Sequence, residues 1–417
     1  MTIKLRNITD SLLVLALALG LAGLGGFAIQ AAGQPERVIV TFDHAVNENA
    51  RIALGDLGGR ILKELPLVNG VVVLLPNEAA AADIAALANV RSVEKDAWVF
   101  TLKPPGSCSP WPSCKDSAGD DGGSTQPAEN IEWGVDRIDA DLAWETSRGL
   151  GVKVAIIDTG IDKDHADLID NLRGGVNFVS KSPAKPADPN KWDDDNGHGT
   201  HVAGIVAAAD NEIGVIGTAP EAYLWAVKVL NRNGSGYTSD VIDGITWAMN
   251  NGMQVINMSL GSASDTQAMH DAVDAAYAAG VIIVAAAGNS GDGSGSTNEV
   301  IYPAKYSSVI AVAATVSDDT TPTWSSEGEE VEIAAPGVNI RSTWNDGLYN
   351  TISGTSMASP HVAGTVALML GAGVLPAEVR AVLQTTADDL GDAGYDNFYG
   401  YGLVDAEEST TGNQTNQ

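Results

Sequence analysis

The sequence predicts an α/β protein whose mostly parallel sheet carries helices on both faces, preceded by a small ferredoxin-like α+β domain. From residue 131 onward, strand-like apolar runs alternate with helical patterns, the order that gives a helix-covered parallel sheet. Residues 37–102 show a second pattern, the shorter order βαββαβ. The length of 417 residues suits one large α/β domain with a small one.

Residues 1–33 are predicted to be a secretory signal peptide. Lys4 and Arg6 precede an apolar run at 12–24, and the small residues 31–33 suit cleavage. The run is short for a helix that spans a membrane, so we expect export and release into the extracellular medium. A retained membrane anchor is the alternative.

The small domain, residues 34–102, is followed by a linker at 103–130 that is rich in Pro and Gly. Cys108 and Cys114, the two cysteines of the chain, lie in this linker. In an exported protein such a pair is expected to form one disulfide, because zinc would need two more ligands and no histidine lies nearby. In the small domain, strands are predicted at 38–42, 60–65, 71–75 and 90–94, and helices at 47–57 and 79–88.

The large domain, residues 131–406, is predicted to hold the functional site at the edge where its parallel strands end. The polar residues 407–417 that follow are predicted to be disordered. In this domain, strands are predicted at 152–157, 223–230, 255–260, 281–286 and 309–315, and helices at 204–209, 239–250, 267–279 and 362–370.

The negative charge of the chain is concentrated after the small domain. Of 23 basic and 53 acidic residues, 8 and 10 lie up to Leu102, which leaves a net charge of −28 in the rest out of −30 in total. This acidity argues against nucleic acid or an anionic membrane as a partner. It suits solubility, cation binding or a salty habitat.

Three segments of the large domain carry side chains suited to nucleophilic catalysis. Ser356 lies in Ser-Gly-Thr-Ser-Met-Ala-Ser-Pro-His (353–361), where its hydroxyl would be presented at a helix N-terminus. Asp158 ends a buried strand-like run, and His198 opens a helical pattern after an acidic, glycine-rich entry. Each also has an ordinary structural interpretation, as a turn residue, a packed histidine or a cap.

Metal binding is the rival interpretation of the histidines. His198 and His201 are three residues apart, so both could lie on one face of a helix. No glutamate follows in the zinc-protease pattern His-Glu-x-x-His, and zinc is therefore disfavoured. We expect His201 and His361 to be structural.

In this chain order Asp158, His198 and Ser356 resemble the triad of the subtilisin-like serine proteases, the subtilase family, over residues 131–406. The resemblance implies that Ser356 attacks the scissile carbonyl, that His198 transfers the proton, and that Asp158 orients the imidazole. It also implies that Asn289 donates to the oxyanion, together with the Ser356 N–H.

The same resemblance implies that residues 34–102 are a propeptide. Such a domain assists folding and then inhibits the enzyme by laying its C-terminal tail, here 93–102, in the active site. We expect self-cleavage between Leu102 and Lys103. Residues 103–130 would then form an N-terminal extension of the mature enzyme. The alternative is a permanent accessory domain.

The resemblance further implies that an extended substrate adds as a strand between two edge segments. Ile301 stands where the family lines the floor of the first specificity pocket, often with Gly. A preference for Leu over Phe or Tyr just before the cleaved bond is therefore expected. The residues expected to contact substrate are Gly234, Ser235, Gly236, Ser259, Leu260, Gly261, Ala287, Gly288 and Ile301.

Residues 209–215 resemble the calcium loop of the family, with an ordinary polar turn as the alternative. Glu129 stands where a side-chain amide is usual; a carboxylate there keeps an oxygen ligand and adds charge, which suits Ca²⁺. The insert at 181–192 and the three aspartates after it leave open a second calcium site or a solvated loop. The expected ligands are side-chain oxygens of Glu129, Asp167 and Asn211 and carbonyls of Ala209, Ile213 and Val215.

Together these observations predict a secreted, calcium-stabilised serine endopeptidase that is made as an autoprocessed zymogen. We expect a monomer that acts on proteins and peptides, that is inhibited by its own propeptide, and that contacts no membrane after signal removal. A processing protease of more restricted specificity and an inactive, protease-like binding protein are the alternatives.

Overall fold

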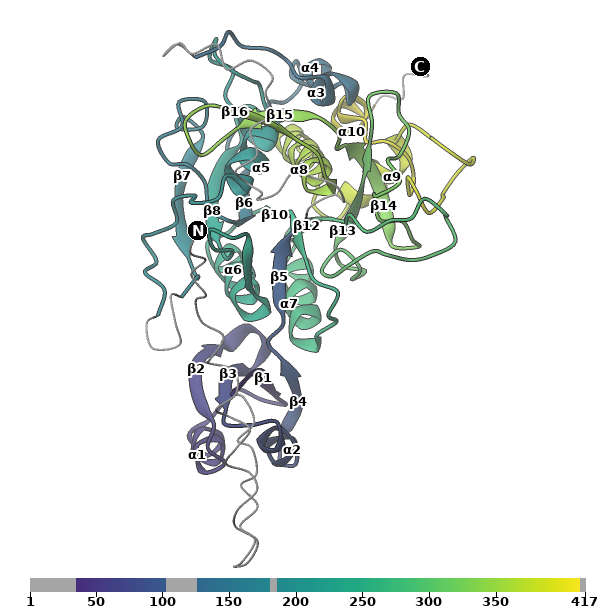
Figure 1. Cartoon of the computed structure of the whole chain (residues 1–417). Helices are drawn as coiled ribbons and strands as arrows, with labels where there is room; N and C mark the ends of the chain where they lie inside the picture. The colour runs from purple at the N-terminus through teal and green to yellow at the C-terminus, as the bar shows by residue number, and fades with distance from the viewer. Residues whose placement is uncertain (1–34, 103–125, 181–185, 413–417) are drawn as a thin grey trace, which may run out of the picture.

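The computed structural model describes residues 35–102, 126–180 and 186–412, and the predicted signal peptide, Lys103 and both cysteines lie outside them. A small domain lies against one side of a large one (Figure 1). The small domain comprises β1 (Glu36–Phe42), α1 (Glu48–Asp56), β2 (Arg60–Leu65), the 3₁₀ turn η1 (Pro66–Val68), β3 (Gly70–Leu75), α2 (Ala79–Ala85), β4 (Val90–Lys95) and β5 (Trp98–Thr101).

The large domain follows with a longer series of strands and helices. In chain order they are α3 (Trp133–Arg137), α4 (Ala140–Ala143), β6 (Lys153–Asp158), β7 (Leu172–Asn177), α5 (His198–Ala207), β8 (Tyr223–Lys228), β9 (Ser235–Tyr237), α6 (Thr238–Asn250), β10 (Val255–Met258), β11 (Leu260–Gly261), α7 (Gln267–Ala278), β12 (Ile282–Ala286), β13 (Ile310–Thr315), β14 (Val331–Pro336), β15 (Ile340–Thr343), β16 (Tyr349–Ile352), α8 (Thr355–Ala372), α9 (Val379–Thr386) and α10 (Ala406–Thr411).

The small domain has an antiparallel sheet in the order β2-β3-β1-β4, which confirms the ferredoxin-like prediction. Successive side chains of a strand point to opposite faces. Val38 and Val40 of β1 accordingly belong to the core of the small domain. Ile39 between them packs with residues of α6 and α7 in a core of the large domain. The sheet is therefore buried on both faces.

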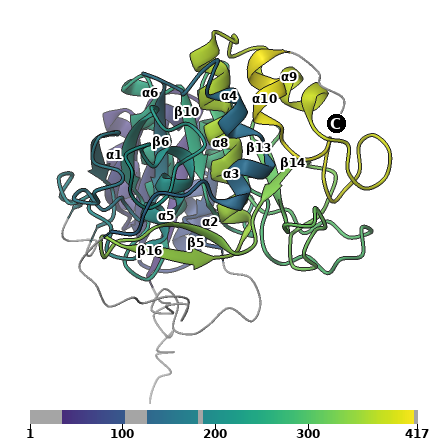
Figure 2. The ribbon, with the colours of Figure 1, turned by 90° about the horizontal axis from the view of Figure 1, so that it is seen from above.

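The large domain is built on a seven-stranded parallel sheet in the order β14-β13-β12-β10-β6-β8-β7. In β6, Val154 and Ile156 face a core shared with α5 and α8. Ala155 and Ile157 face the opposite core, shared with α6 and α7. Figure 2 shows α8 running along one side of the sheet with α3 and α4 next to it. The predicted α/β class, with helices on both faces, is confirmed.

Two strands of this sheet, β7 and β14, were not predicted from the sequence. β7 contains Arg173 and two glycines, so it lacks an apolar run. β14 contains Glu332, whose side chain is almost fully buried because Arg380 of α9 forms an ion pair with it. A buried strand that contains a charged residue is hard to predict from the sequence when the residue that neutralises the charge lies far away in the chain.

The prediction that residues 407–417 are disordered is wrong for the first part of this tail. Residues 406–411 form helix α10, which is capped by the Asp405 side chain accepting from Glu408 N at 2.7 Å. Ser409 and Thr410 are buried, and Thr386 of α9 bonds Ser409 through the two hydroxyls. Small polar side chains can be buried when a neighbouring element supplies their hydrogen bonds.

Among the helices of residues 35–102, 126–180 and 186–412, none combines the length and the apolar character that a membrane span requires.

Candidate active site

Asp158 and His198 meet at the carboxyl edge of the sheet. Asp158 is the last residue of β6 and His198 the first of α5, and both side chains are fully buried. The His198 Nδ1 lies 2.9 Å from Asp158 Oδ1 and 2.8 Å from Oδ2. A proton on Nδ1 is thus held by the carboxylate, which makes Nε2 the basic nitrogen of the ring.

Glycines allow this approach. Gly197, just before His198, has a φ of 112°, and a Cβ there would lie 2.4 Å from the Trp344 ring. A Cβ on Gly199, just after it, would lie 2.2 Å from the carbonyl oxygen of Gly160. Larger residues at either position would push the imidazole away from Asp158.

Two charged residues hold the segments that carry Asp158 and His198: Lys228, which sequence reasoning missed, and Asp194, one of the three aspartates considered for a second calcium site. The Lys228 Nζ donates to the carbonyl of Thr159, next to Asp158, and to Asp195 Oδ1 at 2.6 Å. The Asp194 carboxylate accepts from the amides of residues 196, 197 and 200 around the start of α5. Lys228 and Asp194 show no motif in the sequence because their roles depend on contacts between distant segments.

Ser356 is the second residue of α8 and lies beside the end of β10. Its Oγ donates to the carbonyl of Ser259 at 3.2 Å, and the Ser259 Oγ donates to the carbonyl of Ser356 at 2.8 Å. Since β10 and β6 are neighbours in the sheet, Ser356 and Asp158 lie at the ends of adjacent parallel strands. α5 packs against α8, so His198 and Ser356 begin two neighbouring helices.

Asn289 lies beyond the end of β12, the next strand of the sheet. Its Oδ1 accepts from the N and the Oγ1 of Thr355, both at 2.9 Å, so the amide is oriented. The Asn289 Nδ2 is buried and has no hydrogen-bond partner within the described parts of the chain. A Cβ built on Gly354 would lie 3.2 Å from this Nδ2 and 3.6 Å from both Ser356 N and Leu102 O. Two N–H donors and one carbonyl oxygen therefore surround one point.

Strand β5, which ends just before Leu102, places the Leu102 carbonyl near Asn289 and Ser356. It forms the middle of a three-stranded antiparallel sheet, β11-β5-β9, in which Leu260 pairs with Thr101 and Gly236 with Val99. The amide of Thr101 donates to the carbonyl of Gly234 at 2.9 Å. The end of the small domain thus lies as an added strand between β9 and β11, a space referred to below as the cleft, and is held by main-chain hydrogen bonds that any extended peptide could form.

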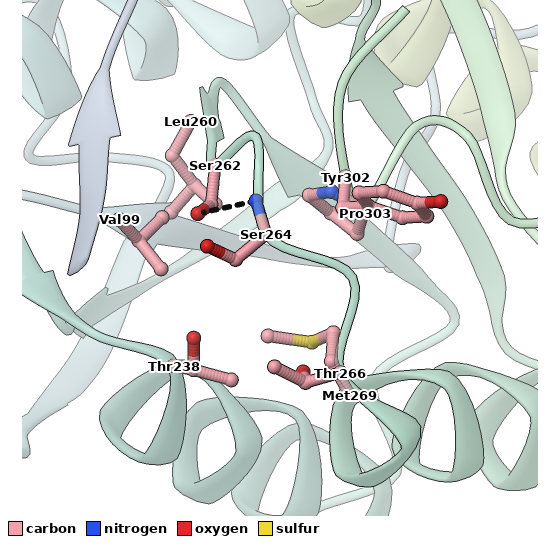
Figure 3. A pocket seen from close by; sticks show the side chains of 9 residues that line it. All are labelled: Val99, Thr238, Leu260, Ser262, Ser264, Thr266, Met269, Tyr302 and Pro303. Carbon is pink, nitrogen blue, oxygen red and sulfur yellow. Dashed lines mark hydrogen bonds between the residues drawn. The ribbon is translucent and has the colours of Figure 1, made fainter. Parts of the chain in front are cut away.

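Every second side chain of β5 points into the large domain. Val99 is 2% exposed and lines a small pocket whose other side chains are apolar, aromatic or hydroxyl-bearing (Figure 3). The pocket floor includes Met269 of α7, and Tyr302 and Leu260 form its walls. Ile301 lies next to Tyr302. A Cβ built on Gly261 would lie 2.3 Å from Ile301 Cδ1, and a Cβ built on Gly288 would lie 3.3 Å from Ile301 Cγ1. The Ile301 side chain thus fills the space between Gly261 and Gly288.

The residues expected to bind calcium gather around one buried carboxylate. Asp167 Oδ2 accepts from Val215 N and from the Tyr349 hydroxyl, both at 3.1 Å. Its Oδ1 is buried and, within the described residues, unpaired. Burial raises the pKa of Asp167 to about 7. Glu129 Oε1 accepts from Asn211 N at 2.7 Å. A buried carboxylate oxygen without a donor, beside oxygen-rich neighbours, fits a hard cation such as Ca²⁺.

A second carboxylate group lies apart from this loop. Asp292, Glu299 and Glu327 offer oxygens within 4.8 Å of one another, and no local motif predicts this cluster because the three residues are spread over 36 positions. His201, the rival metal ligand, faces two backbone carbonyls through its Nε2, at 3.1 Å each. Burial lowers the pKa of His201 to about 3 and that of His361 to about 4, so both rings are neutral.

Comparison with known proteins gives a consistent result. The sequence profile of the Subtilase family matches residues 149–402. Subtilisin DY of Bacillus licheniformis is 49% identical over 283 residues, which cover 67% of this chain and 98% of that protein. Subtilisin E of Bacillus subtilis (strain 168) is 39% identical over 388 residues, 91% of this chain and 92% of that protein. An alkaline protease of Shouchella clausii is 45% identical over 289 residues, 69% of this chain and 71% of that protein.

Proposed function

Since the chain belongs to the subtilase family and is a serine endopeptidase, we propose that Asp158, His198 and Ser356 are its catalytic triad. Ser356 Oγ attacks the carbonyl carbon of the scissile bond while His198 Nε2 accepts its proton. The same proton then passes to the leaving amine, and water hydrolyses the acyl-enzyme by the reverse sequence. Asp158 keeps the imidazole oriented and stabilises its charged form, as the 2.8 Å contact with Nδ1 allows.

Asn289 Nδ2 and Ser356 N are the proposed donors to the oxyanion. Thr355 holds the Asn289 amide through two hydrogen bonds, so the donor is oriented before substrate binds. Such preorganised donors stabilise the charge that develops on the carbonyl oxygen. The observation that carries this assignment is the position of Leu102 O. This carbonyl oxygen, Asn289 Nδ2 and Ser356 N all lie within 3.6 Å of the point where a Cβ on Gly354 would be.

The same observation supports a zymogen that cleaves itself after Leu102. The carbonyl of Leu102 lies beside the proposed oxyanion donors, and β5 occupies the cleft as a substrate would. After cleavage the small domain, residues 34–102, remains as an inhibitor until it is degraded. Export with loss of residues 1–33 is part of this proposal, as is the Cys108–Cys114 disulfide in the extension at 103–130.

The proposal is tested by the intact mass of the precursor without residues 1–33, purified in calcium as wild type, Ser356→Ala and Ser353→Ala. Wild type and the control Ser353→Ala, altered three residues away in the same segment, should yield two fragments divided after Leu102. Ser356→Ala should stay whole. If wild type stays whole, the zymogen proposal fails. If Ser356→Ala splits at the same bond, Ser356 is not the nucleophile.

Calcium is proposed to bind at Asp167 with a structural role. The side chains of Glu129 and Asn211 and the carbonyls of Ala209, Ile213 and Val215 complete the proposed ligand set. A bound cation would pair with the buried, unpaired Asp167 Oδ1. It would join the loop at 209–215 to the segment just before the large domain, which contacts it through the Glu129–Asn211 hydrogen bond. We further infer a monomeric enzyme.

A further inference from the structure

The ring of Tyr237, the last residue of β9, contacts an aromatic ring of the strand in the cleft. Trp98 and Tyr237 are register partners in the β5–β9 pair. Their ring centroids lie 4.2 Å apart with 28° between the planes, a stacked arrangement. Trp98 is 45% exposed, so its indole lies on Tyr237 at the surface of the molecule.

The register fixes which substrate position would meet this ring. When the bond after Leu102 is the one cleaved, Leu102 is the first residue before it and Trp98 the fifth. Side chains alternate along a strand, so the fourth residue, Val99, points inward while Trp98 points outward. A substrate that pairs with β9 in the same register places its fifth side chain against Tyr237.

The environment of Tyr237 changes when the small domain leaves. The Arg37 guanidinium also lies over the ring, 4.1 Å from its centroid, but Arg37 belongs to β1, outside the cleft. A substrate in the place of β5 cannot supply that contact. Trp98, in contrast, lies in the strand that a substrate would replace. Tyr237 stays in the mature enzyme and offers the face that now carries the indole.

We propose that Tyr237 is a specificity-determining residue that favours an aromatic side chain five positions before the scissile bond. The inference rests on the proposed function, because it takes β5 as a stand-in for substrate. Stacked aromatic pairs contribute enough beyond simple burial to change an equilibrium or a rate by about two- to twelvefold. The preferred substrates are therefore extended segments with a Trp, Tyr or Phe at this position and an apolar residue at the first.

The test compares kcat/KM for three p-nitroanilides: Ala-Trp-Val-Phe-Thr-Leu, the same peptide with Ala for Trp, and the same with Leu for Trp. The mature enzyme is used as wild type, Tyr237→Phe, Tyr237→Leu and Tyr277→Leu, the last a half-exposed tyrosine of α7 as control. Each enzyme is judged by its own Trp/Ala ratio, so general losses of activity cancel. A Val-Phe-Thr-Leu p-nitroanilide without the fifth residue reports activity by itself.

The expected Trp/Ala ratio is at least about two- to twelvefold in wild type, Tyr237→Phe and Tyr277→Leu, and smaller by about that factor in Tyr237→Leu, which keeps apolar contact but loses the stacking. The Trp/Leu ratio should fall in the same way, since Leu supplies apolar area but no ring. Equal Trp/Ala ratios in wild type and Tyr237→Leu overturn this inference alone. If wild type does not cleave the shorter peptide, the proposed function fails and the inference falls with it.

Discussion

The side-chain amide of Asn289, the proposed oxyanion donor, is held in one orientation by Thr355. Thr355 fixes the carbonyl end of its amide with two hydrogen bonds, and the amide nitrogen is left for a different partner. A buried donor without an acceptor costs about 1–3 kcal/mol. If Asn289 is the oxyanion donor proposed above, an oxygen that acquires negative charge at this position relieves that cost, and the charged intermediate is favoured over the neutral substrate.

We propose that Ile301 limits the depth of the first specificity pocket. Its side chain lies between Gly261 and Gly288 and takes up room that a large aromatic ring would need. We expect Ile301→Gly, which removes all four side-chain carbons, to raise the ratio of kcat/KM for Phe over Leu by at least about tenfold, because a single methylene in an apolar pocket already changes discrimination by about 10- to 200-fold. Matched p-nitroanilides that differ in their last residue measure it.

The control for this prediction is Ile131→Gly, an exposed isoleucine outside the sheet. It should keep the wild-type Phe/Leu ratio. A Phe/Leu ratio that is the same in wild type and Ile301→Gly would mean that Ile301 does not limit the pocket.

The residues of the site differ in how visible they are in the sequence. Asp158, His198, Ser356 and Asn289 could be chosen because each ends or begins an apolar element within a recognisable segment. The structure places them at the carboxyl ends of neighbouring strands, β6, β10 and β12. Lys228 and Thr355 could not be assigned in this way, since an ion pair and a hydroxyl contact across the chain leave no local pattern.

At the scale of elements, the parallel strands with continuous apolar runs were predictable from the sequence, and those with charges or glycines were not. α5 begins at His198, as expected for the residue that opens the helical pattern, although the predicted range covered only 204–209. The first turn contains His, Gly and Thr, which are weak helix formers and hide this part of the helix from a propensity-based prediction. Contacts with the preceding segment stabilise that turn: Asp194 accepts from Thr200 N at 3.0 Å and from its hydroxyl at 2.6 Å.

The loop at 209–215 should make stability depend on calcium. On a Ser356→Ala background, which avoids self-digestion, we expect calcium to raise the Tm by several degrees. A ligand at one hundred times its Kd adds about 2.7 kcal/mol. Asp167→Asn should lose most of this increase, whereas the exposed Asp170→Asn should keep it. Differential scanning calorimetry with calcium or with a chelator provides the comparison.

Two results would contradict the calcium assignment. One is a Tm that calcium leaves unchanged in the parent protein. The other is an equal calcium response in the Asp167→Asn and Asp170→Asn variants.

Helix α10 should make stability depend on pH through Asp405. Burial, and then the nearby Asp139 and Asp388, raise the pKa of Asp405 to about 7 from an ordinary 3.8. Between these values the native state keeps a proton that the unfolded chain releases. The contribution of Asp405 to the free energy of unfolding therefore falls as pH rises from about 4 to about 7, by on the order of 3 kcal/mol.

Asp405→Asn keeps an acceptor for the Glu408 amide but cannot ionise. Relative to the parent, the variant should gain stability with rising pH, with little difference at pH 4 and the full difference at pH 8. Urea unfolding on the Ser356→Ala background at both pH values measures it. A difference between variant and parent that does not change with pH would refute the role given to Asp405.

For the whole molecule, the contact between the two domains combines apolar packing with charges at the ends of two helices. Glu94 accepts from the first amides of α7, Gln267 N at 2.8 Å and Ala268 N at 3.2 Å. Asp96 accepts from Ser239 N near the start of α6 at 2.9 Å. Carboxylates are stabilised at helix N-termini. The sequence could predict both domains, but not this docking, which depends on two carboxylates matching two helix ends.

Lys63 adds an ion pair to the same contact. Its Nζ lies 2.6 Å from Asp240 Oδ1 and 2.6 Å from Asp243 Oδ2, both on α6. Lys63→Ala leaves two largely buried carboxylates together, so the cleaved small domain should be held about 5- to 150-fold more weakly, from a loss of about 1–3 kcal/mol. The lag before full activity in a peptide assay of freshly processed enzyme should be shorter.

Lys95→Ala, at an exposed lysine of the same domain, is the matched control and should keep the wild-type lag. Equal lags for the two lysine variants would show that the α6 ion pairs do not retain the small domain.

The sheet β11-β5-β9 has one more consequence, for solubility. When β5 is withdrawn, it leaves two strand edges with free N–H and C=O groups. Exposed edges recruit strands of other molecules and seed aggregation, most of all when they are long and flat. Here β9 has three residues and β11 two, each with a glycine. Edges this short can bind one peptide placed between them, yet neither can alone template a growing fibril.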